Sequence, residues 1–442
     1  MTRPHILIIG GGASGVLLAA HLLRDPDADI RITLIEKRGE VGRGVAYSAR
    51  QQDHVLNVAA PGMSAFADDP DHFWRWLLGR GLVSEANRFV FMPRRLYGEY
   101  LSEVLGKHID DGRLQLLHDT VVAVHPSATG VELTLESGTS VVGHSAVLAV
   151  GHEERAARAK GIAVRVGSEE DTPLDPDADV MILGSGLSMV DAWLTLSQSE
   201  HRGPVTVVSR HGLLPKSHRD VEKMELEAAD VPFGTELHYF ADWFRETVDE
   251  HVGRGGNWRG AVDALRPFNQ RIWQDWSTHS RRRFLEHVRP FWNIHRHRLP
   301  PDLYDRMRAA VDAGQVRLVA GKVLDIDRAG DRVQARVRVK GSDSDQAIEV
   351  ARVYDCGGVS VDVLQSSNPA VQSLITSGAA RPDELHIGLD VTRDCAVLDA
   401  GGVASTRLFA VGPLTRGTFF EIEAIPDIRM QVAGLAGRLV GH

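Results

Sequence analysis

Two glycine-rich turns in this 442-residue chain each follow a short apolar run and precede a segment of helical periodicity. The first turn joins an expected strand, His5–Ile9, to a helix that should end near Arg24. It carries the G-x-G-x-x-G pattern at Gly10, Gly12 and Gly15. In a strand–turn–helix unit these glycines allow the tight turn, the approach of the backbone to a pyrophosphate, and close helix–strand packing. The pattern therefore predicts a dinucleotide-binding unit.

A carboxylate follows this unit at the spacing that a nucleotide ribose requires. The next apolar run, Ile30–Ile35, ends at Glu36, which stands about 20 residues after Gly15. A carboxylate at this place accepts hydrogen bonds from the ribose diol. Strand, turn, helix and acid occur together here, and this combination favours a nucleotide site over a coincidental glycine turn.

A second unit of the same design lies in the middle of the chain. The expected strand Val180–Leu183 precedes Gly184 and Gly186, but Met189 stands where the third glycine is expected. The next strand ends in Ser209–Arg210 with no carboxylate. An arginine at this position attracts a ribose 2′-phosphate and so favours NADPH over NADH. A solvated surface charge is the alternative interpretation of this arginine.

Each glycine turn is followed, much later in the chain, by alternating strands and then by an apolar strand that ends in glycine. These are Val121–Leu135 and Ala146–Gly151 in the first half, and Val323–Val339 and Val353–Gly358 in the second. The repeat predicts an α/β fold with two Rossmann-like dinucleotide-binding domains. We expect residues 1–175 to begin the first domain, 176–350 to form the second with a helical insertion at about 212–300, and 351–442 to return to the first.

Composition excludes several classes of partner and of chemistry. A net charge of −9 argues against a nucleic-acid partner, because such proteins neutralise a phosphate backbone. Cys356 and Cys395 form no C-x-x-C pair, which excludes a disulfide framework, and no histidine pair has helical metal-binding spacing. No stretch reaches the roughly 18 apolar residues of a spanning helix. We expect a cytoplasmic protein with no metal and no membrane partner, and the oligomeric state stays open.

Together these motifs resemble the flavoproteins with two dinucleotide-binding domains of the glutathione-reductase-like architecture. In that family FAD binds the first domain and NAD(P)H the second. The closing segment Leu408–Pro413 is similar to the strand with which the family's chain returns to FAD, and its Gly412 would approach the flavin pyrophosphate. Other segments resemble the branch that contains FAD-dependent urate hydroxylases and L-aspartate N-monooxygenases: Val41–Ser48, His54–Val58, Met63–Ser64, Asp68–Pro70, Ser209–Pro215 and Gly417–Ile422.

The motifs and the resemblance together imply a set of site residues. The FAD-binding candidates are Gly10, Gly12, Ser14, Gly15, Glu36, Lys37, Arg43, Val122, Gly151 and Gly412. The candidates for binding NADPH or NADH are Gly184, Gly186, Leu187, Ser188, Ser209 and Arg210. The resemblance also places Asn57, Met63 and Ser64 beside the isoalloxazine as catalytic candidates. For Met63 ordinary core packing is the alternative, whereas a buried Asn57 amide needs partners that a flavin edge offers.

The activity that the resemblance implies is that of an FAD-dependent, NAD(P)H-driven monooxygenase. NAD(P)H would reduce the flavin, O₂ would form a flavin hydroperoxide, and one oxygen atom would pass to a small-molecule substrate. The cofactor carries the hard step, so no dedicated protein acid or base is required. A flavin reductase or oxidase that passes electrons to a partner is the first alternative, and a non-catalytic flavin-binding protein is the second. The tryptophan-rich insertion favours an enclosed substrate pocket.

The insertion ends in a basic segment that suggests the charge of the substrate. Arg296 and Arg298 alternate with histidines just before Leu299–Pro301, and the prolines favour an extended exit. On an extended segment both guanidiniums share a face and would hold a carboxylate or a urate-like anion. We therefore include Arg298 among the catalytic-site candidates and expect a small anionic, nitrogen-bearing substrate. The alternatives are a grip on the NAD(P) pyrophosphate and a solvated surface.

Overall fold

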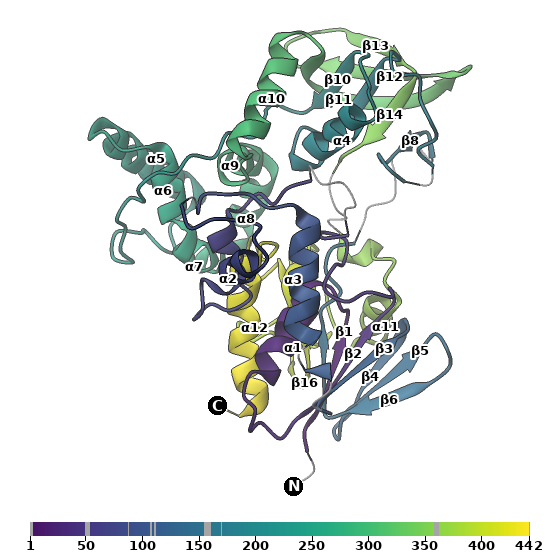
Figure 1. Ribbon diagram of the computed structural model, residues 1–442, viewed down its shortest axis with the longest axis vertical. Helices are drawn as coiled ribbons and strands as arrows, with labels where there is room; N and C mark the ends of the chain where they lie inside the picture. Colours follow the sequence, from purple (N-terminus) through teal and green to yellow (C-terminus); the bar gives the residue numbers. More distant parts are fainter. Residues whose placement is uncertain are drawn as a thin grey trace. The chain divides into compact units, whose positions relative to one another are not determined.

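The structure is a computed structural model that describes residues 3–48, 54–86, 88–106, 108–109, 112–153, 161–168, 170–357 and 362–441. The chain forms two compact units (Figure 1). Unit 1 comprises Met1–Glu153, Phe268–Thr278 and Ser360–His442, and unit 2 comprises Glu154–Pro267 and His279–Val359. Residues 154–175 and 351–359 thus belong to unit 2, and residues 268–278 to unit 1, unlike in the division expected from the sequence. The expected α/β fold class is confirmed.

Unit 1 is built on a six-stranded sheet with the order β15-β16-β7-β1-β2-β3. Every neighbouring pair is parallel except β15 with β16. The central strands read as continuous apolar runs because both faces of a parallel sheet are covered. The bounds are β1 (His5–Ile9), β2 (Arg31–Glu36), β3 (Leu114–His118), β7 (Ser145–Leu148), β15 (Ala396–Leu398) and β16 (Ala404–Ala410).

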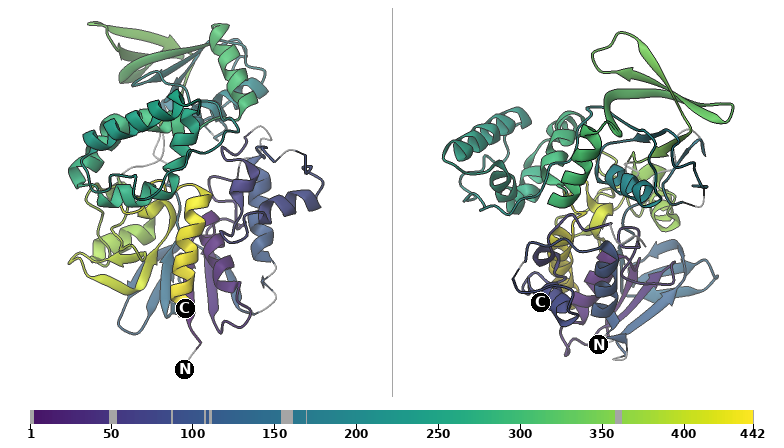
Figure 2. Two further views of the ribbon diagram at one scale, coloured as in Figure 1. Left: turned by 90° about the vertical axis from the view of Figure 1, so that its left-hand side faces the viewer. Right: turned by 45° about the horizontal axis from the view of Figure 1, so that its top comes forward.

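Two hydrophobic clusters flank this sheet. One lies between the sheet and the helices α1 (Ala13–Leu23), α3 (Arg94–Gly106) and α12 (Ile425–Val440), and α1 contacts both of the others (Figures 1 and 2). The other lies toward a small antiparallel sheet and α11. The remaining bounds in unit 1 are η1 (Ala60–Met63), α2 (His72–Gly79), β4 (Val121–Pro126), β5 (Val131–Leu135), β6 (Ser140–Gly143), α7 (Asn269–Asp275), η6 (Val363–Gln365), α11 (Pro369–Ser377) and η7 (Gly412–Thr415).

Unit 2 contains a seven-stranded sheet with the order β13-β12-β11-β10-β9-β14-β8. Strand β11 changes partners along its length: Val316 to Ala320 pair in parallel with β10, and Gly321 onward pairs antiparallel with β12. The bounds are β8 (Ala163–Val164), β9 (Val180–Leu183), β10 (Val205–Ser209), β11 (Val316–Ala329), β12 (Arg332–Val339), β13 (Asp345–Val350) and β14 (Arg352–Asp355). Because β8 and β14 pair within this sheet, the residues around them join unit 2.

The helices of unit 2 either adjoin its strands in sequence or belong to the insertion. Helix α4 follows the second glycine turn and α10 precedes β11, whereas the others belong to the insertion between β10 and α10 (Figures 1 and 2). The bounds are α4 (Leu187–Gln198), α5 (Leu237–Gly253), α6 (Trp258–Ala264), η4 (Arg266–Phe268), α8 (Thr278–Arg283), η5 (Phe284–Val288), α9 (Arg289–Arg296) and α10 (Pro301–Asp312).

Helix α7 is the part of the insertion that packs in unit 1. The Trp273 ring stacks on Phe420 with centroids 4.8 Å apart, and its indole N–H donates to the Gly417 carbonyl at 2.8 Å. Gln274 donates to the Thr418 carbonyl at 3.2 Å. A buried aromatic ring with a satisfied N–H is a strong anchor, and it accounts for the separation of this segment from its neighbours in sequence.

We predict that Trp273→Ala lowers the free energy of unfolding by about 3–5 kcal/mol, the usual cost of truncating a buried tryptophan. Trp273→Phe should lose less, because it keeps the ring contact and gives up only the indole hydrogen bond. Urea denaturation followed by far-UV circular dichroism measures both. Trp243→Ala on the more exposed α5 is the control and should change stability little. Equal loss in the Trp243 and Trp273 variants would contradict the anchoring role of Trp273.

Candidate functional site

The first glycine turn has the geometry of a dinucleotide cradle. Gly10 has φ of +107°, and a Cβ there would lie 2.6 Å from the Ala149 carbonyl oxygen. A Cβ on Gly15 would overlap the Gly10 carbonyl oxygen. At Gly12, in contrast, the nearest atom to a Cβ is the Cα of Gly44 at 3.7 Å. Gly10 and Gly15 are therefore demanded by the fold, whereas Gly12 leaves space over the turn that a phosphate can use.

The carboxyl ends of three neighbouring strands meet at this turn. Gly10 follows β1 and packs against Ala149, the first residue after β7 and two residues before Gly151. Gly412 follows β16, and a Cβ on it would overlap the Ser14 hydroxyl in the first turn of α1. The structure thus brings together residues that are far apart in sequence at the edge where α/β proteins bind their ligands.

Glu36 lies beside the turn with its carboxylate held by backbone groups. One oxygen accepts the Gly11 N–H at 2.6 Å and the other accepts the Arg38 N–H at 2.9 Å. Each carboxylate oxygen retains a further acceptor site, so the group is fixed and can still receive a ribose hydroxyl. Its neighbour Lys37 is exposed, and Val122 on β4 is partly buried.

A loop that includes Arg43 closes over the same turn. The Gly42 N–H donates to the Gly11 carbonyl at 2.8 Å, which holds the loop against the glycines. One terminal nitrogen of Arg43 pairs with Glu40 at 2.9 Å, and its buried Nε has no hydrogen-bond partner among the described residues. A guanidinium with an unused N–H beside the cradle fits an anionic or carbonyl-bearing ligand.

The second glycine turn, in unit 2, repeats the first with one substitution. Gly184 has φ of +95°, and a Cβ on it would lie 2.7 Å from the Cys356 carbonyl oxygen. Gly186 is exposed and has nothing within 4 Å of a Cβ. Met189, in place of the third glycine, is 0% exposed and fills the core beneath α4. The open face of the turn is therefore retained without the third glycine.

The end of β10 is tied to this second turn. The Ser185 hydroxyl donates to the Ser209 hydroxyl at 2.8 Å, and Ser209 accepts the Gly212 N–H at 3.0 Å. Arg210 is exposed next to them. Burial lowers the pKa of His211, and the positive charges of Lys340 and Arg210 lower it further. The Lys340 N–H donates to the carbonyl of Ala320, which pairs with Ser209, so two cations and a neutral imidazole lie at the end of β10.

Comparisons with known proteins agree with this geometry. The model of an FAD-NAD(P)-binding family matches residues 7–153. The FAD-dependent monooxygenase eupB of Phoma sp. is 28% identical over 142 residues, which are 29% of this chain and 30% of that protein. The chain thus spans about a third of the length of that curated relative.

Solved structures match over almost the whole chain. The ornithine N-hydroxylase of Kutzneria sp. 744 has a TM-score of 0.67 at 15% identity and covers 98% of both chains. The L-lysine 6-monooxygenase of Pseudomonas syringae has a TM-score of 0.65 at 15% identity, also over 98% of both. The bacillithiol disulfide reductase of Bacillus cereus has a TM-score of 0.55 at 16% identity, over 99% of this chain and 98% of that one. The fold is that of the two-domain FAD/NAD(P) flavoproteins.

The candidates expected beside the flavin differ in burial. Asn57 is partly accessible, as a ligand contact requires. Ser64 is 0% and Met63 2% exposed. The Ser64 hydroxyl lies 3.0 Å from the Phe66 carbonyl oxygen and accepts the Phe66 N–H at 3.1 Å. Ser64 and Met63 thus pack inside unit 1, and their place beside the isoalloxazine stays a prediction.

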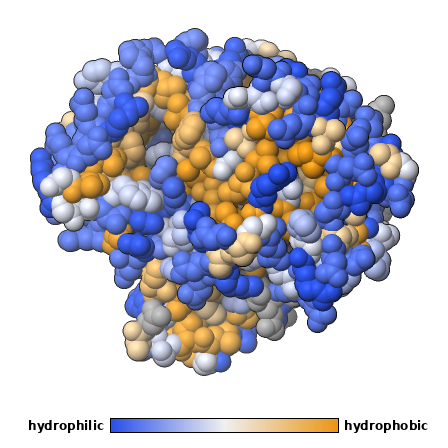
Figure 3. Space-filling model, turned by 90° about the horizontal axis from the view of Figure 1, so that it is seen from above, coloured by the Kyte–Doolittle hydropathy of each residue, from blue (hydrophilic) through white to orange (hydrophobic). Residues whose placement is uncertain are grey.

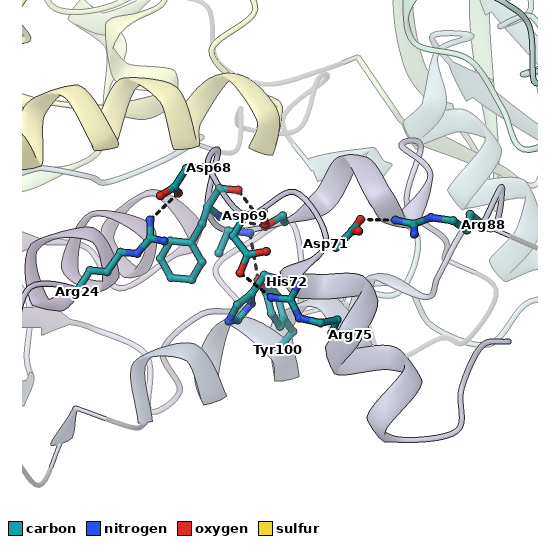
Figure 4. Close-up of polar contacts among 11 residues, drawn as sticks. Arg24, Asp68, Asp69, Asp71, His72, Arg75, Arg88 and Tyr100 are labelled. Carbon is teal, nitrogen blue, oxygen red and sulfur yellow. Dashed lines mark hydrogen bonds and ion pairs between the residues drawn. The ribbon is translucent and has the colours of Figure 1, made fainter. Parts of the chain in front are cut away.

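The loop around Ser64 is held by ion pairs and a tyrosine (Figure 4). Asp68 pairs with Arg24 at 2.5 Å and Asp69 with Arg75 at 2.6 Å, while Tyr100 contacts His72 at 2.7 Å. A further pair joins Asp71 and Arg88. Hydrogen bonds from arginine lower the pKa of both Asp68 and Asp69. Each of these aspartates is paired with an arginine at the surface, where such a pair contributes little to stability.

The predicted extended conformation of the segment with Arg296 and Arg298 is wrong at Arg296. Arg296 is the last residue of α9, so it does not alternate with Arg298 on one extended face. Arg298 is 1% exposed and pairs with Asp263, while its Nε and Nη1 have no hydrogen-bond partner among the described residues. Burial lowers the pKa of Arg298 and Asp263 raises it. Arg298 is therefore an interior cation and not part of a surface pair.

Sequence reasoning missed His152, which directly follows Gly151. Its Nε2 lies 3.8 Å from a carboxylate oxygen of Glu423, and Arg416 lies at the same distance from that oxygen. Burial lowers the pKa of His152, against the opposing effect of Glu423. The imidazole is therefore neutral near pH 7 and stands at the strand edge where the cofactor is expected.

Two general findings concern metals and membranes. The part of the chain that the structure describes holds no group of three or more histidine, cysteine or acidic residues placed to bind a metal ion. Among the helices built from those residues, none has the length and apolar character that crossing a membrane requires.

We predict that Gly12→Val and Gly15→Val fail in different ways. Gly12→Val should fold but lose FAD, because its side chain enters the space over the turn. Gly15→Val should fail to fold, because even its Cβ meets the Gly10 carbonyl. The flavin absorbance per protein and the melting temperature separate the two outcomes. Gly39→Val is the matched control, since nothing lies within 4 Å of a Cβ there. Normal flavin content in Gly12→Val would overturn the role of this turn.

Proposed function

We propose that this protein is an FAD-dependent, NADPH-driven monooxygenase that hydroxylates a small anionic, nitrogen-bearing substrate. The observation that carries the proposal is the pair of open glycine turns, each with different chemistry beside it. The first has a fixed carboxylate, Glu36, suited to the ribose of FAD. The second has Arg210 and Lys340 instead, suited to the 2′-phosphate of NADPH.

The residues of unit 1 fit the cofactor and have defined tasks. No side chain caps the N-terminus of α1, because its N-cap residue is Gly12. The amides of the first turn of α1 would bind the pyrophosphate. Glu36 would hold the ribose, and Asn57 and Arg43 would orient the ring system with hydrogen bonds. The chemistry supplied by bound FAD is acceptance of hydride from NADPH and activation of O₂. The protein's part is to position these groups and keep water away.

A nitrogen atom as the site of hydroxylation is suggested by the neighbours in structure. Two of them are named as hydroxylating ornithine or lysine, molecules that carry both an amine and a carboxylate. Arg298 supports an anionic group on the substrate, because it is a cation with two nitrogens whose N–H groups have no partner among the described residues. The narrower likeness to urate hydroxylases and aspartate N-monooxygenases stays a prediction.

A reductase that works through a dithiol is the less favoured function. The two cysteines are Cys356 and Cys395, and burial raises the pKa of each to about 12. Such thiols carry almost no thiolate at neutral pH and are poor nucleophiles. An electron-transferring reductase or oxidase without a dithiol, and a non-catalytic flavoprotein, are the remaining alternatives, and they are outcomes of the experiment below.

The test uses the purified full-length protein. NADPH added without oxygen should bleach bound flavin, and oxygen added afterwards should yield a hydroxylamine from an amino acid of the correct charge. L-aspartate, L-ornithine and L-lysine are the first probes, with the hydroxylamine measured by mass spectrometry. Complete release of peroxide with every substrate would favour the oxidase, and flavin that NADPH cannot reduce would favour a non-catalytic role.

We predict that Arg210→Ala raises the Michaelis constant for NADPH by an amount worth about 1.5–3 kcal/mol, a hydrogen bond to a charged group. The constant for NADH should stay nearly unchanged, because NADH lacks the 2′-phosphate. Lys340→Ala should act in the same direction. Arg317→Ala, an exposed arginine on β11, is the control. Equal effects on both nucleotides would show that Arg210 does not recognise the phosphate.

We predict that Arg298→Lys raises the Michaelis constant for the amino-acid substrate at least about tenfold and leaves flavin reduction by NADPH intact. A lysine keeps the charge near Asp263 but lacks the further N–H groups with which the guanidinium can reach a second partner. A loss confined to NADPH would reassign Arg298 to the cofactor. No kinetic change in a correctly folded variant would leave Arg298 as a structural residue.

A further inference from the structure

An exposed aromatic side chain stands beside the end of β10. Apolar side chains reach the surface of the molecule in places, as Figure 3 shows for the face seen from above. One of them is Phe291 on α9, which is 46% exposed. Its ring centroid lies 5.0 Å from that of His211, with 49° between the ring planes. Exposure of a phenyl ring to water is unfavourable, and a ligand that stacks on the ring would remove this exposure.

His211 connects this aromatic pair to the second glycine turn. It follows Arg210 directly, and the Ser185–Ser209 hydrogen bond at 2.8 Å joins the end of β10 to the turn. In a Rossmann unit the pyrophosphate lies on the glycine turn and the adenosine ribose lies at the end of the second strand. The base attached to that ribose must then lie beyond the strand, where the chain continues to His211.

The main chain holds Phe291 in place relative to this strand end. The Lys216 N–H donates to the Ile294 carbonyl of α9 at 2.9 Å, and the Leu299 N–H donates to the Lys216 carbonyl at 2.8 Å. The segment after β10 is thus bonded to α9 and to the residues that follow it. An aromatic platform on rigid elements binds a flat ligand at low entropic cost.

The charges around the pair fit the same ligand. Arg210 and Lys340 are the cations that lower the pKa of His211, after burial. They would meet a 2′-phosphate, while the neutral imidazole and the phenyl ring would meet the uncharged base. The cations that would bind the phosphate therefore adjoin the rings that would bind the base. The 2′-phosphate and the adenine are neighbours in the ligand in the same way.

We infer that Phe291 and His211 bind the adenine ring of NADPH. The helical insertion therefore takes part in cofactor binding. The inference rests on the proposed use of NADPH by unit 2. It adds a base-stacking residue from α9 to a site whose other residues come from the glycine turn and the sheet.

Binding of adenosine 2′,5′-bisphosphate, the half of the cofactor that carries base and phosphate, tests the inference directly. Calorimetry on the flavin-loaded protein should show a dissociation constant about tenfold weaker for Phe291→Ala, within the range for loss of base–aromatic stacking. Phe291→Tyr keeps the ring and should bind like the wild type. Val252→Ala, another exposed apolar position in unit 2 at 46% exposure, is the matched control.

Flavin reduction provides the second measurement. In anaerobic stopped-flow experiments Phe291→Ala should weaken NADPH binding about tenfold and leave the limiting reduction rate unchanged. Reduced nicotinamide mononucleotide lacks the adenosine half of NADPH. It should therefore reduce the flavin at the same rate in Phe291→Ala and in the wild type. Equal losses with both reductants, or normal binding of the bisphosphate by Phe291→Ala, would overturn the inference. Failure of NADPH to reduce the wild-type flavin would instead overturn the proposed function.

Discussion

In unit 1 a strand that turns straight into a helix leaves no room for a side chain where the two meet, and the arrangement of the glycine turn depends on this contact. In unit 1 the helix lies so close that a Cβ at Gly15 would occupy the place of the Gly10 carbonyl oxygen. The closeness aims the first amides of α1 at the space over Gly12. The Ala149 carbonyl and the Gly412 backbone pack against the same few residues, so the ends of β7 and β16 are aligned by the turn as well.

The second turn shows which part of this constraint is essential. Met189 replaces the third glycine and is entirely buried, yet Gly184 keeps its positive φ and Gly186 its open face. Close helix–strand packing can thus be replaced by a side chain that fills the core, whereas the free approach to the second glycine cannot. A carboxylate lies beside the first turn and cations lie beside the second. We therefore propose that unit 1 binds FAD and unit 2 binds NADPH.

Local features of the fold followed from the sequence, and features set by distant contacts did not. The strands at His5–Ile9 and Val180–Leu183 end where their glycines begin, because the turn chemistry is local. Proline restricts only the residue before it, so the prolines after Leu299 could not keep α9 from running to Arg296. Lys340 was missed because only the folded sheet brings it to the end of β10, whereas His152 was passed over although it directly follows Gly151. The burial of Ser64 was not foreseen, because likeness to a motif carries no information on burial.

The order of the segments in unit 1 has a consequence for synthesis on the ribosome. The sheet needs β16, which pairs with β7, and α12, which packs on α1, and both come from the last part of the chain. Unit 2 ends at Val359, so all its residues emerge before the partners that complete unit 1. Until then β7 presents an unpaired edge to other nascent chains. Unit 1, whose first residues are synthesised before unit 2, is therefore completed after unit 2, and α7 can pack in unit 1 only once Phe420 has been synthesised.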